Sequence, residues 1–184
     1  MKALLSLISV VLLPLSAIAV DAIDKKVVVD MLNARRAAYL AGDPAPLIRS
    51  ASPDITVTII SSIVEGPAGT RQMRMPQYAP FLKEAFANTE YYAYQFKGVK
   101  AQIADDGQSA KVFVDIEEEA RVQGLPVTAE KALVISLILK DGDVKVASLT
   151  EKIENVDAGA RFKSKPEPVE PTGGAGQTSV KIGQ

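Results

Sequence analysis

The sequence predicts an α+β domain in which helices pack on one face of a largely antiparallel sheet. Residues 91–153 contain three long alternating segments and a shorter fourth, separated by turns rich in Gly and Asp. In the central segment, Ser109–Val122, apolar and polar side chains alternate, which is typical of a strand with one face on a core and the other nearer water. The residues before these segments show helical periodicity. The sequence therefore places helices first and a meander of strands after them.

The first residues are predicted to be a secretory signal. Lys2 precedes the apolar run Ala3–Leu15, and Ala17-Ile18-Ala19 has the small-x-small pattern that a signal peptidase needs. We expect cleavage after Ala19, with cleavage after Ala22 as the nearby alternative. The run is shorter than the roughly 20 apolar residues of a membrane span, and an uncleaved anchor is the other interpretation. Export without cysteine fits a bacterial periplasm or the exterior, so the predicted location is periplasmic or secreted.

Composition excludes several kinds of chemistry. The chain has no cysteine and no histidine, which removes disulfides, thiolate catalysis and the commonest general base and metal ligand. Its 21 basic and 22 acidic residues give a net charge of −1, so we expect no nucleic-acid partner. The sequence contains no phosphate-binding loop, nucleophile elbow or metal-ligand spacing, so we expect no cofactor and no metal.

Three helices are expected before the four long strands. Asp24–Ala41 carries an apolar stripe at 3.6-residue periodicity and is followed by Gly42 as a stop signal. Asp43 is a suitable cap for a short second helix, with proline in its first turn. The third helix is expected from about Pro80 to Asn88, because proline is tolerated in the first turn only.

The strands are justified by alternation and by turn residues. Two short strands are expected on either side of a turn at Glu65–Gly69, and the longer strands form the meander. The segments expected as strands are Ile55–Ile60, Thr70–Arg74, Tyr91–Ile103, Ser109–Val122, Thr128–Lys140 and Val144–Ile153. Within the fifth, Leu133–Leu139 is apolar on both faces except at Ser136. Such a run indicates an interior strand or one whose outer face meets a partner, so we expect a homodimer through the sheet.

The end of the chain has a different composition. Lys163–Gln184 is rich in Pro and Gly and has hardly any apolar residues, which predicts a disordered tail. The expected organisation is a signal peptide over residues 1–19, one α+β domain over 20–157 and a tail over 158–184.

Three short motifs, in order, resemble the nuclear transport factor 2-like (NTF2-like) superfamily in its SnoaL-like branch. They are Ala41-Gly42-Asp43, Ser52-Pro53-Asp54 and the segment Asp141–Val146, and the resemblance covers Asp24–Glu154. It implies a curved mixed sheet wrapped around about three helices, a cone-shaped α+β roll with a central pocket. Val144 departs from the pattern, because many relatives have a tryptophan there.

The superfamily contains both enzymes and binding domains, so the fold alone implies no activity. The SnoaL-like and dehydratase chemistries resemble acid–base work that depends on histidine, which this chain lacks. Ketosteroid isomerase uses a carboxylate base and two oxyanion donors. Carried over, the base position is occupied by Ile59 and the donor positions by Arg35 and Ser136. That mechanism is therefore not supported.

Two charged residues fall on apolar faces. Arg35 lies near the middle of the apolar stripe of the first helix, and Glu118 lies on the apolar face of the central strand. Because an isolated buried charge is costly, the two are expected to pair with each other, unless Glu118 lies at an open rim. Alternatively, Arg35 binds a carboxylate or phosphate of a ligand in the pocket.

Other polar residues are secondary candidates. Tyrosines are expected either in the core or lining an aromatic pocket, namely Tyr39, Tyr78, Tyr92 and Tyr94. Asp115, Glu117 and Glu119 share the outer face of the central strand, flanked by Lys111 and Arg121, and are expected to form a solvated, salt-bridged face rather than a cation site.

Three functions compete. The first is an exported, non-catalytic domain that binds a small apolar or anionic ligand, or a partner protein. The second is a lyase or isomerase with Glu118 as candidate base and Arg35 or a tyrosine as stabiliser. The third is a structural subunit of an envelope assembly, attached to the membrane only if the signal segment is uncleaved. The candidate pocket residues are Arg35, Tyr39, Tyr78, Tyr94, Glu118 and Ser136.

Overall fold

The computed structural model describes residues 20–61 and 69–159. The predicted signal segment and its cleavage site, most of the turn before Gly69 and nearly all of the predicted tail lie outside the described residues. The described elements are α1 (Lys25–Ala41), α2 (Ala45–Ser50), β1 (Ala51–Ser61), β2 (Gly69–Met73), α3 (Met75–Ala87), β3 (Thr89–Ile103), β4 (Ser109–Val122), β5 (Leu125–Lys140) and β6 (Asp143–Ala158). In these residues, no helix is both long enough and apolar enough to cross a membrane.

The helices begin and end at the residues that local chemistry favours. The Asp24 carboxylate accepts the Val27 N–H at 2.8 Å at the start of α1. Gly42 ends the helix with a φ of 64°, and its N–H reaches the carbonyls of Ala38 and Tyr39. α1 therefore has a fixed start and end, which fixes where its inward side chains lie.

The six strands form one mixed sheet in the order β2-β1-β6-β5-β4-β3. Strands β3 to β6 are consecutive antiparallel neighbours, while β1 joins the edge of β6 in parallel and pairs with β2 in the antiparallel sense. Two residues with positive φ, Asp141 at 55° and Gly142 at 77°, make the tight turn between β5 and β6. The expected meander is confirmed.

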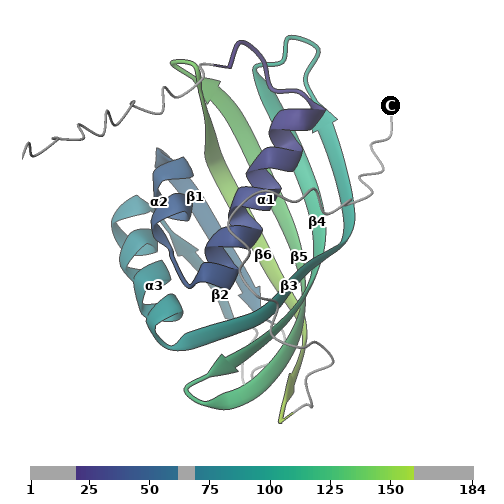
Figure 1. The fold of residues 1–184 in the computed structure, drawn as a ribbon. Coiled ribbons are helices and arrows are strands. Elements are labelled where there is room, and N and C mark those ends of the chain that lie inside the picture. Colours follow the sequence, from purple (N-terminus) through teal and green to yellow (C-terminus); the bar gives the residue numbers. More distant parts are fainter. Residues whose placement is uncertain (1–19, 62–68, 160–184) are drawn as a thin grey trace, which may run out of the picture.

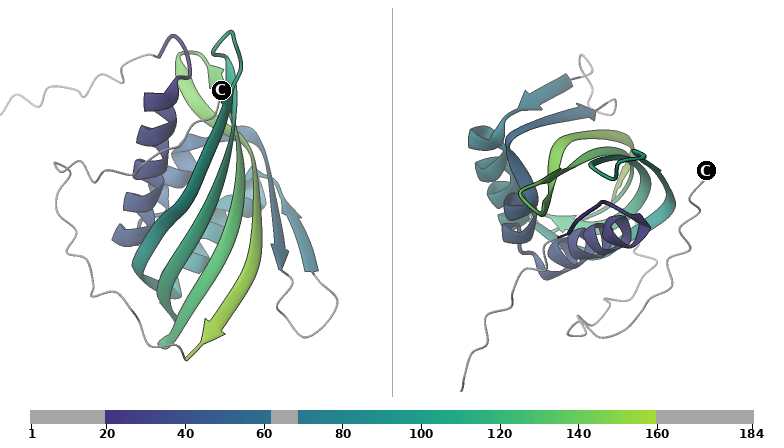
Figure 2. Two further views of the ribbon diagram at one scale, coloured as in Figure 1. Left: turned by 90° about the vertical axis from the view of Figure 1, so that its right-hand side faces the viewer. Right: turned by 90° about the horizontal axis from the view of Figure 1, so that it is seen from above.

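The sheet is strongly curved and does not close. Register shifts interrupt both the β3–β4 and the β5–β6 pairing, and such bulges bend a strand and increase its twist. α1 lies across the inner face of the sheet, with α2 and α3 beside it (Figure 1). From above, the strands curl around the interior while α1 covers the open side (Figure 2). This is the predicted α+β roll.

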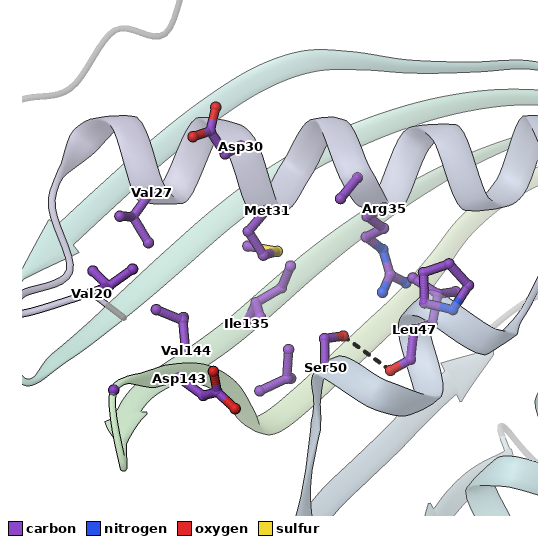
Figure 3. A pocket seen from close by; sticks show the side chains of 14 residues that line it. Val20, Val27, Asp30, Met31, Arg35, Leu47, Ser50, Ile135, Asp143 and Val144 are labelled. Carbon is purple, nitrogen blue, oxygen red and sulfur yellow. Dashed lines mark hydrogen bonds between the residues drawn. The ribbon is translucent and has the colours of Figure 1, made fainter. Parts of the chain in front are cut away.

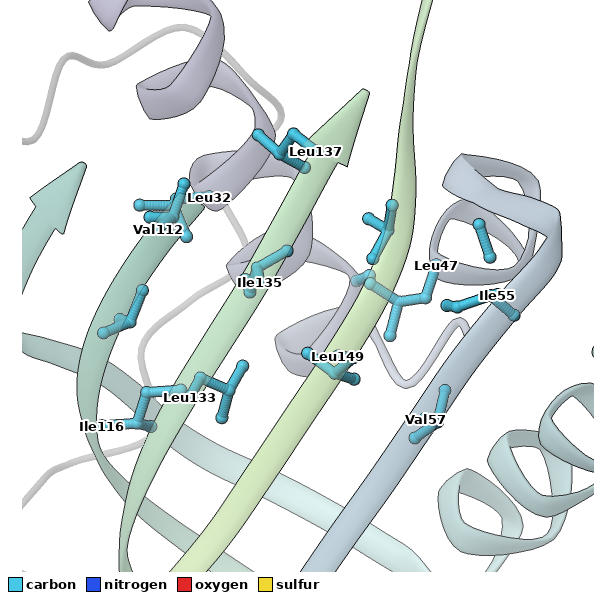
Figure 4. Packing of buried hydrophobic residues seen from close by; sticks show 14 of the residues in the cluster. Leu32, Leu47, Ile55, Val57, Val112, Ile116, Leu133, Ile135, Leu137 and Leu149 are labelled. Carbon is cyan, nitrogen blue, oxygen red and sulfur yellow. The ribbon is translucent and has the colours of Figure 1, made fainter. Parts of the chain in front are cut away.

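The core fills the space between the inner face of the sheet and the helices (Figure 4). Leu32 of α1 and Leu47 of α2 meet side chains from four strands. The labelled strand residues of this cluster are Ile55, Val57, Val112, Ile116, Leu133, Ile135, Leu137 and Leu149. On β4 and β5 they alternate with less buried residues, as the pattern of period two predicts.

Some element boundaries differ from the sequence-based expectation. α3 begins at Met75 rather than near Pro80. The Gln77 side chain accepts the Arg74 N–H at 3.2 Å, and Pro76 occupies the first turn, where its missing N–H is not needed. Pro80 is inside the helix, where the lost hydrogen bond is offset by burial of Tyr78 and Leu82. Strands β1, β3, β5 and β6 are all longer than expected, because sheet pairing extends beyond the alternating residues.

We predict that Gly107→Ala destabilises the fold more than Gly42→Ala. The two glycines have φ values of 65° and 64°, so the left-handed backbone costs both alanine variants about 1 kcal/mol. Only at Gly107 would the new Cβ meet another group, 2.7 Å from the Cβ of Ala22. The Ile23 N–H also donates to the Gly107 carbonyl at 2.7 Å. Urea unfolding of both variants measures the difference, and equal losses would contradict the packing of residues 22–23 on this turn.

Candidate functional site

An inner cavity of about 180 Å³ lies between α1, α3 and the inner face of β1, β5 and β6. Most of its wall is aromatic or aliphatic. Three charged residues also line it, Arg35 from α1, Lys131 from β5 and Glu151 from β6. The aromatic lining residues are Tyr39, Tyr78, Phe81, Phe86 and Tyr91. An enclosed apolar space with a few converging polar groups is the usual form of a small-molecule site.

Arg35 is held by phenols, one of which, Tyr78 of α3, hydrogen-bonds it from the neighbouring helix. Its Nε donates to the Tyr94 hydroxyl and its Nη2 donates to the Tyr39 hydroxyl, each at 3.1 Å. The guanidinium also lies 5.1 Å from the centre of the Tyr39 ring, and the Tyr39 and Tyr94 rings stack at 4.2 Å. With 7% of its surface exposed, Arg35 is a buried cation whose orientation is fixed by neutral groups.

Lys131 lies between two carboxylates. Its Nζ is 2.7 Å from Glu118 Oε1 on β4 and 3.1 Å from Glu151 Oε1 on β6, the strands on either side. The three side chains are 9–14% exposed. In the described part of the chain, Glu118 Oε2 is buried without a hydrogen-bond partner. The group carries one negative charge, which the positive charge of Arg35 balances across the cavity.

Burial and the neighbouring charges shift the pKa values of the two carboxylates in opposite directions. Burial raises the pKa of Glu118 above its ordinary value, although Lys131 opposes the shift. Burial also acts to raise the pKa of Glu151, but the positive charges of Lys131 and Arg35 outweigh it and lower that pKa. Burial acts to lower the pKa of Lys131, and the two carboxylates reverse this and raise it. At neutral pH Glu151 is therefore ionised and Lys131 is charged.

Only some of the candidate residues line the cavity. Arg35, Tyr39 and Tyr78 line the cavity, and Tyr94 supports Arg35 from β3. Glu118 faces inward on β4, but it does not line the cavity.

The expected direct pair between Arg35 and Glu118 is wrong. Glu118 bonds Lys131 instead, because Lys131 lies on the neighbouring strand while Arg35 is engaged by phenols.

Ser136 faces away from the cavity. It lies between the buried residues Ile135 and Leu137 of β5, and its Oγ accepts a hydrogen bond from Ser148 Oγ at 2.8 Å. Its placement as a pocket donor is therefore wrong by one residue, which on a strand means the opposite face. Tyr92 is also outside the cavity, with the Arg121 guanidinium 5.4 Å from its ring.

Sequence reasoning missed Lys131, Glu151 and Tyr91 as cavity residues. The first two carried the same signal as Glu118, a charge in phase with apolar neighbours. Lys131 is two residues from Leu133, and Glu151 is two residues from Leu149. Applied to every strand, the rule that selected Glu118 would have selected both.

The outer carboxylates of β4 do not form one solvated stripe. Asp115 is exposed, and Glu117 pairs with Lys97 at 2.6 Å. Glu119 is only 3% exposed, so its predicted solvation is wrong. It lies opposite Ala93, next to the bulge between Tyr91 and Ala93, where the β3–β4 pairing is irregular. Within residues 20–61 and 69–159, no group of His, Cys, Asp or Glu is arranged to hold a metal ion.

We predict that Lys131→Met destabilises the protein by about 3–5 kcal/mol at neutral pH, because it leaves two buried carboxylates without their cation. Their folded-state pKa values then rise above the unfolded values. Carboxylates shifted in this direction favour the folded state in acid and disfavour it as pH rises through the folded pKa. The stability deficit should therefore shrink as pH falls toward about 4, which urea unfolding across pH measures.

Lys97→Met is the matched control. It breaks an ion pair whose lysine side chain is 50% exposed, so it should cost at most about 1 kcal/mol. A Lys131→Met deficit as small as the control's, or one independent of pH, would contradict the described geometry.

Comparison with known proteins gives a likeness in fold alone. No protein-family model matches the sequence, and no curated protein matches it. An NTF2-like protein from Cytophaga hutchinsonii superposes with a TM-score of 0.57 at 16% identity, over 71% of this chain and 98% of that one. A ketosteroid isomerase-like protein from Erwinia carotovora atroseptica gives a TM-score of 0.53 at 16% identity, over 71% and 95%.

A type 2 hexachlorocyclohexane dehydrochlorinase gives a TM-score of 0.58 at 12% identity, over 76% of this chain and 91% of that one. The similar structures therefore include proteins described as enzymes or enzyme-like, at identities too low to carry over an activity. Together with the curved, unclosed six-stranded sheet and its three helices, they show that this chain has the fold of the NTF2-like superfamily.

Proposed function

We propose that this chain is a non-catalytic binding domain whose inner cavity takes a small molecule with an aromatic or apolar body and one anionic or carbonyl group. The observation that supports this most strongly is Arg35, a buried cation in an aromatic wall, fixed by neutral phenols. A guanidinium has five N–H donors, and the bonds to Tyr94, Tyr39 and Tyr78 use three of them. A ligand oxygen is a suitable acceptor for the others.

The size of the cavity restricts the ligand. Its volume of about 180 Å³ is below the roughly 300 Å³ at which drug-sized pockets begin. Part of the wall is aromatic, and its Tyr39 and Phe86 rings pack against each other with centroids 5.0 Å apart. These dimensions favour a single small ring with one polar substituent.

A lyase or isomerase is the second candidate, and one observation favours it. The raised pKa of Glu118 is the shift that a general base needs, and a dehydrochlorinase and a ketosteroid isomerase-like protein share the fold. However, Glu118 bonds Lys131 and does not line the cavity. The carboxylate that does line it, Glu151, has a lowered pKa and is a weaker base. This geometry favours binding.

Export and dimerisation are part of the same proposal. We propose that the chain is exported after cleavage behind Ala19, and that two copies pair through the outer face of the sheet. The half-buried side chains of Phe113, Val134 and Ile138 on this face support pairing.

Native mass spectrometry of the exported protein should show a dimer whose chains begin at Val20. Val134→Lys should convert it to a monomer, because it places a charge in the apolar outer face, whereas Lys83→Glu, at an exposed position of α3 away from the sheet, should leave the dimer intact. A wild-type monomer at high concentration would rule out the pairing.

Benzoate, a small ring with one carboxylate, is the probe for the inner cavity. Calorimetric titration should show binding to the native chain and at least a roughly tenfold loss for Arg35→Met, because a hydrogen bond to a charged group contributes about 1.5–3 kcal/mol. Arg49→Met, which removes an exposed arginine of α2, is the matched control and should bind normally. If the native chain does not bind benzoate, or if Arg35→Met and Arg49→Met bind it equally, the proposal is wrong.

A further inference from the structure

A second and larger pocket, which we call the outer pocket, lies on another side of Arg35. It has a volume of about 360 Å³ and is bounded by α1, α2 and the first residues of β6. Arg35 lines both spaces, whereas the other charged residues of the inner cavity do not line this one. In Figure 3, Arg35 and Leu47 lie toward one end of the outer pocket, and Val20 and Val144 lie toward the other.

The lining of the outer pocket is graded from a buried floor to exposed edges. Arg35, Leu47 and Ile135 are buried, whereas Val27 and Met31 are half-buried. Val27, Met31 and Arg35 follow one another at four-residue spacing on one side of α1, so within this pocket the two apolar side chains lead to the cation. Eight residues of helix span about 12 Å. The pocket is thus an elongated apolar channel with one buried positive charge.

The volume of the outer pocket depends on a small side chain at position 144. Val144 is half-buried in its wall, in the position where the sequence resemblance leads one to expect a tryptophan. An indole there would occupy space that valine leaves empty. At about 360 Å³ the pocket lies within the range of small-molecule sites, unlike the inner cavity.

We infer that the outer pocket binds a monocarboxylate with an unbranched aliphatic chain. The carboxylate lies at Arg35, and the chain runs along Met31 and Val27 toward Val144. A carboxylate is the acceptor that suits the two N–H donors of Arg35 left by its bonds to Tyr94, Tyr39 and Tyr78. Most of the side chains beside the ligand chain are aliphatic, and the Ser50 hydroxyl already donates to the Leu47 carbonyl at 3.0 Å, so a ligand with its single polar group at one end fits best.

The charges at the pocket edge do not favour the opposite orientation with a cationic head. Asp30 and Asp143 are exposed, and each already faces a lysine: Asp30 is 2.6 Å from Lys26, and Asp143 is 3.2 Å from Lys145. Exposed pairs of this kind contribute little, whereas a charge in a buried, low-dielectric position interacts strongly. The buried guanidinium therefore decides the sign of the ligand.

The inference goes beyond the inner-cavity proposal but shares Arg35 with it. One guanidinium cannot serve two carboxylates without placing like charges close together. Ligands of the two cavities should consequently weaken each other's binding, and the coupling must be equal in both directions.

Octanoate and octan-1-ol are the probes, and calorimetric titration measures the binding of each. The native chain should bind both, and octanoate more tightly. Val144→Trp should weaken both by about tenfold or more because it fills the channel, and Met31→Trp fills the same channel from the opposite wall. Arg35→Met should weaken octanoate and leave octan-1-ol unchanged. Ile59→Phe, which fills the inner cavity only, is the matched control and should leave octanoate binding intact.

Other results would overturn the inference. They are no octanoate binding by the native chain, octanoate binding that survives both tryptophan variants, or equal binding of octanoate and octan-1-ol. The last comparison uses the native chain, so it holds even if Arg35→Met does not fold. If the native chain binds octanoate but not benzoate, the inner-cavity proposal alone is refuted. If it binds benzoate but not octanoate, the outer-pocket inference alone is refuted.

Discussion

Two positive and two negative side chains inside an apolar roll are the constraint on which the rest of this structure depends. Burying an ion costs several kcal/mol unless it is paired. Removing one partner of a buried ion pair destabilises a protein more than replacing both partners with apolar residues. Lys131 meets Glu118 and Glu151 because β4, β5 and β6 are neighbours in the sheet. A shift of one residue along any of these strands would turn its charge to the outer face and leave the others unpaired. The charges therefore specify the same strand register that the apolar alternation requires. The sheet must curve without losing this register.

The bulges reconcile these two requirements. Tyr91 and Tyr94 are three residues apart, so a regular strand would place them on opposite faces. Both nevertheless contact the Tyr39 ring, at centroid distances of 4.9 Å and 4.2 Å, because the pairing shifts between Tyr91 and Ala93. A second shift lies at Glu130/Lys131, beside the buried ion group. These two irregularities bend the sheet and lie beside polar groups that line the cavity, so the shape of the roll and the lining of the site are linked at these points.

These irregularities also explain which features the sequence predicts. Ser109–Val122 was predicted as a strand with its bounds correct, and Glu118 was correctly placed on the inner face, because alternation is a local signal. Ser136 was placed by carrying over a position from the resemblance, and the run Leu133–Leu139, apolar on both faces, contains no alternation that could correct the placement. The partner of Glu118 depends on the pairing of β4 with β5, a non-local feature. The resemblance indicated the roll, whereas the bulges that bring Tyr91 and Tyr94 to the same side have no marker in the sequence.

Arg35 connects the two cavities, and its surroundings explain how one residue can line both. Tyr39 and Tyr94 hold the guanidinium through neutral hydroxyls, which fix its direction without cancelling its charge. Had Glu118 paired with Arg35, the charge of the guanidinium would have been neutralised locally and the outer pocket would have no unpaired cation in its buried wall. Lys131 instead satisfies both carboxylates, at 2.7 Å and 3.1 Å. The division of partners, phenols for the arginine and carboxylates for the lysine, leaves a preorganised cation at the boundary of two apolar spaces. A ligand that meets such a group gains a charge-assisted hydrogen bond without the cost of ordering the side chain.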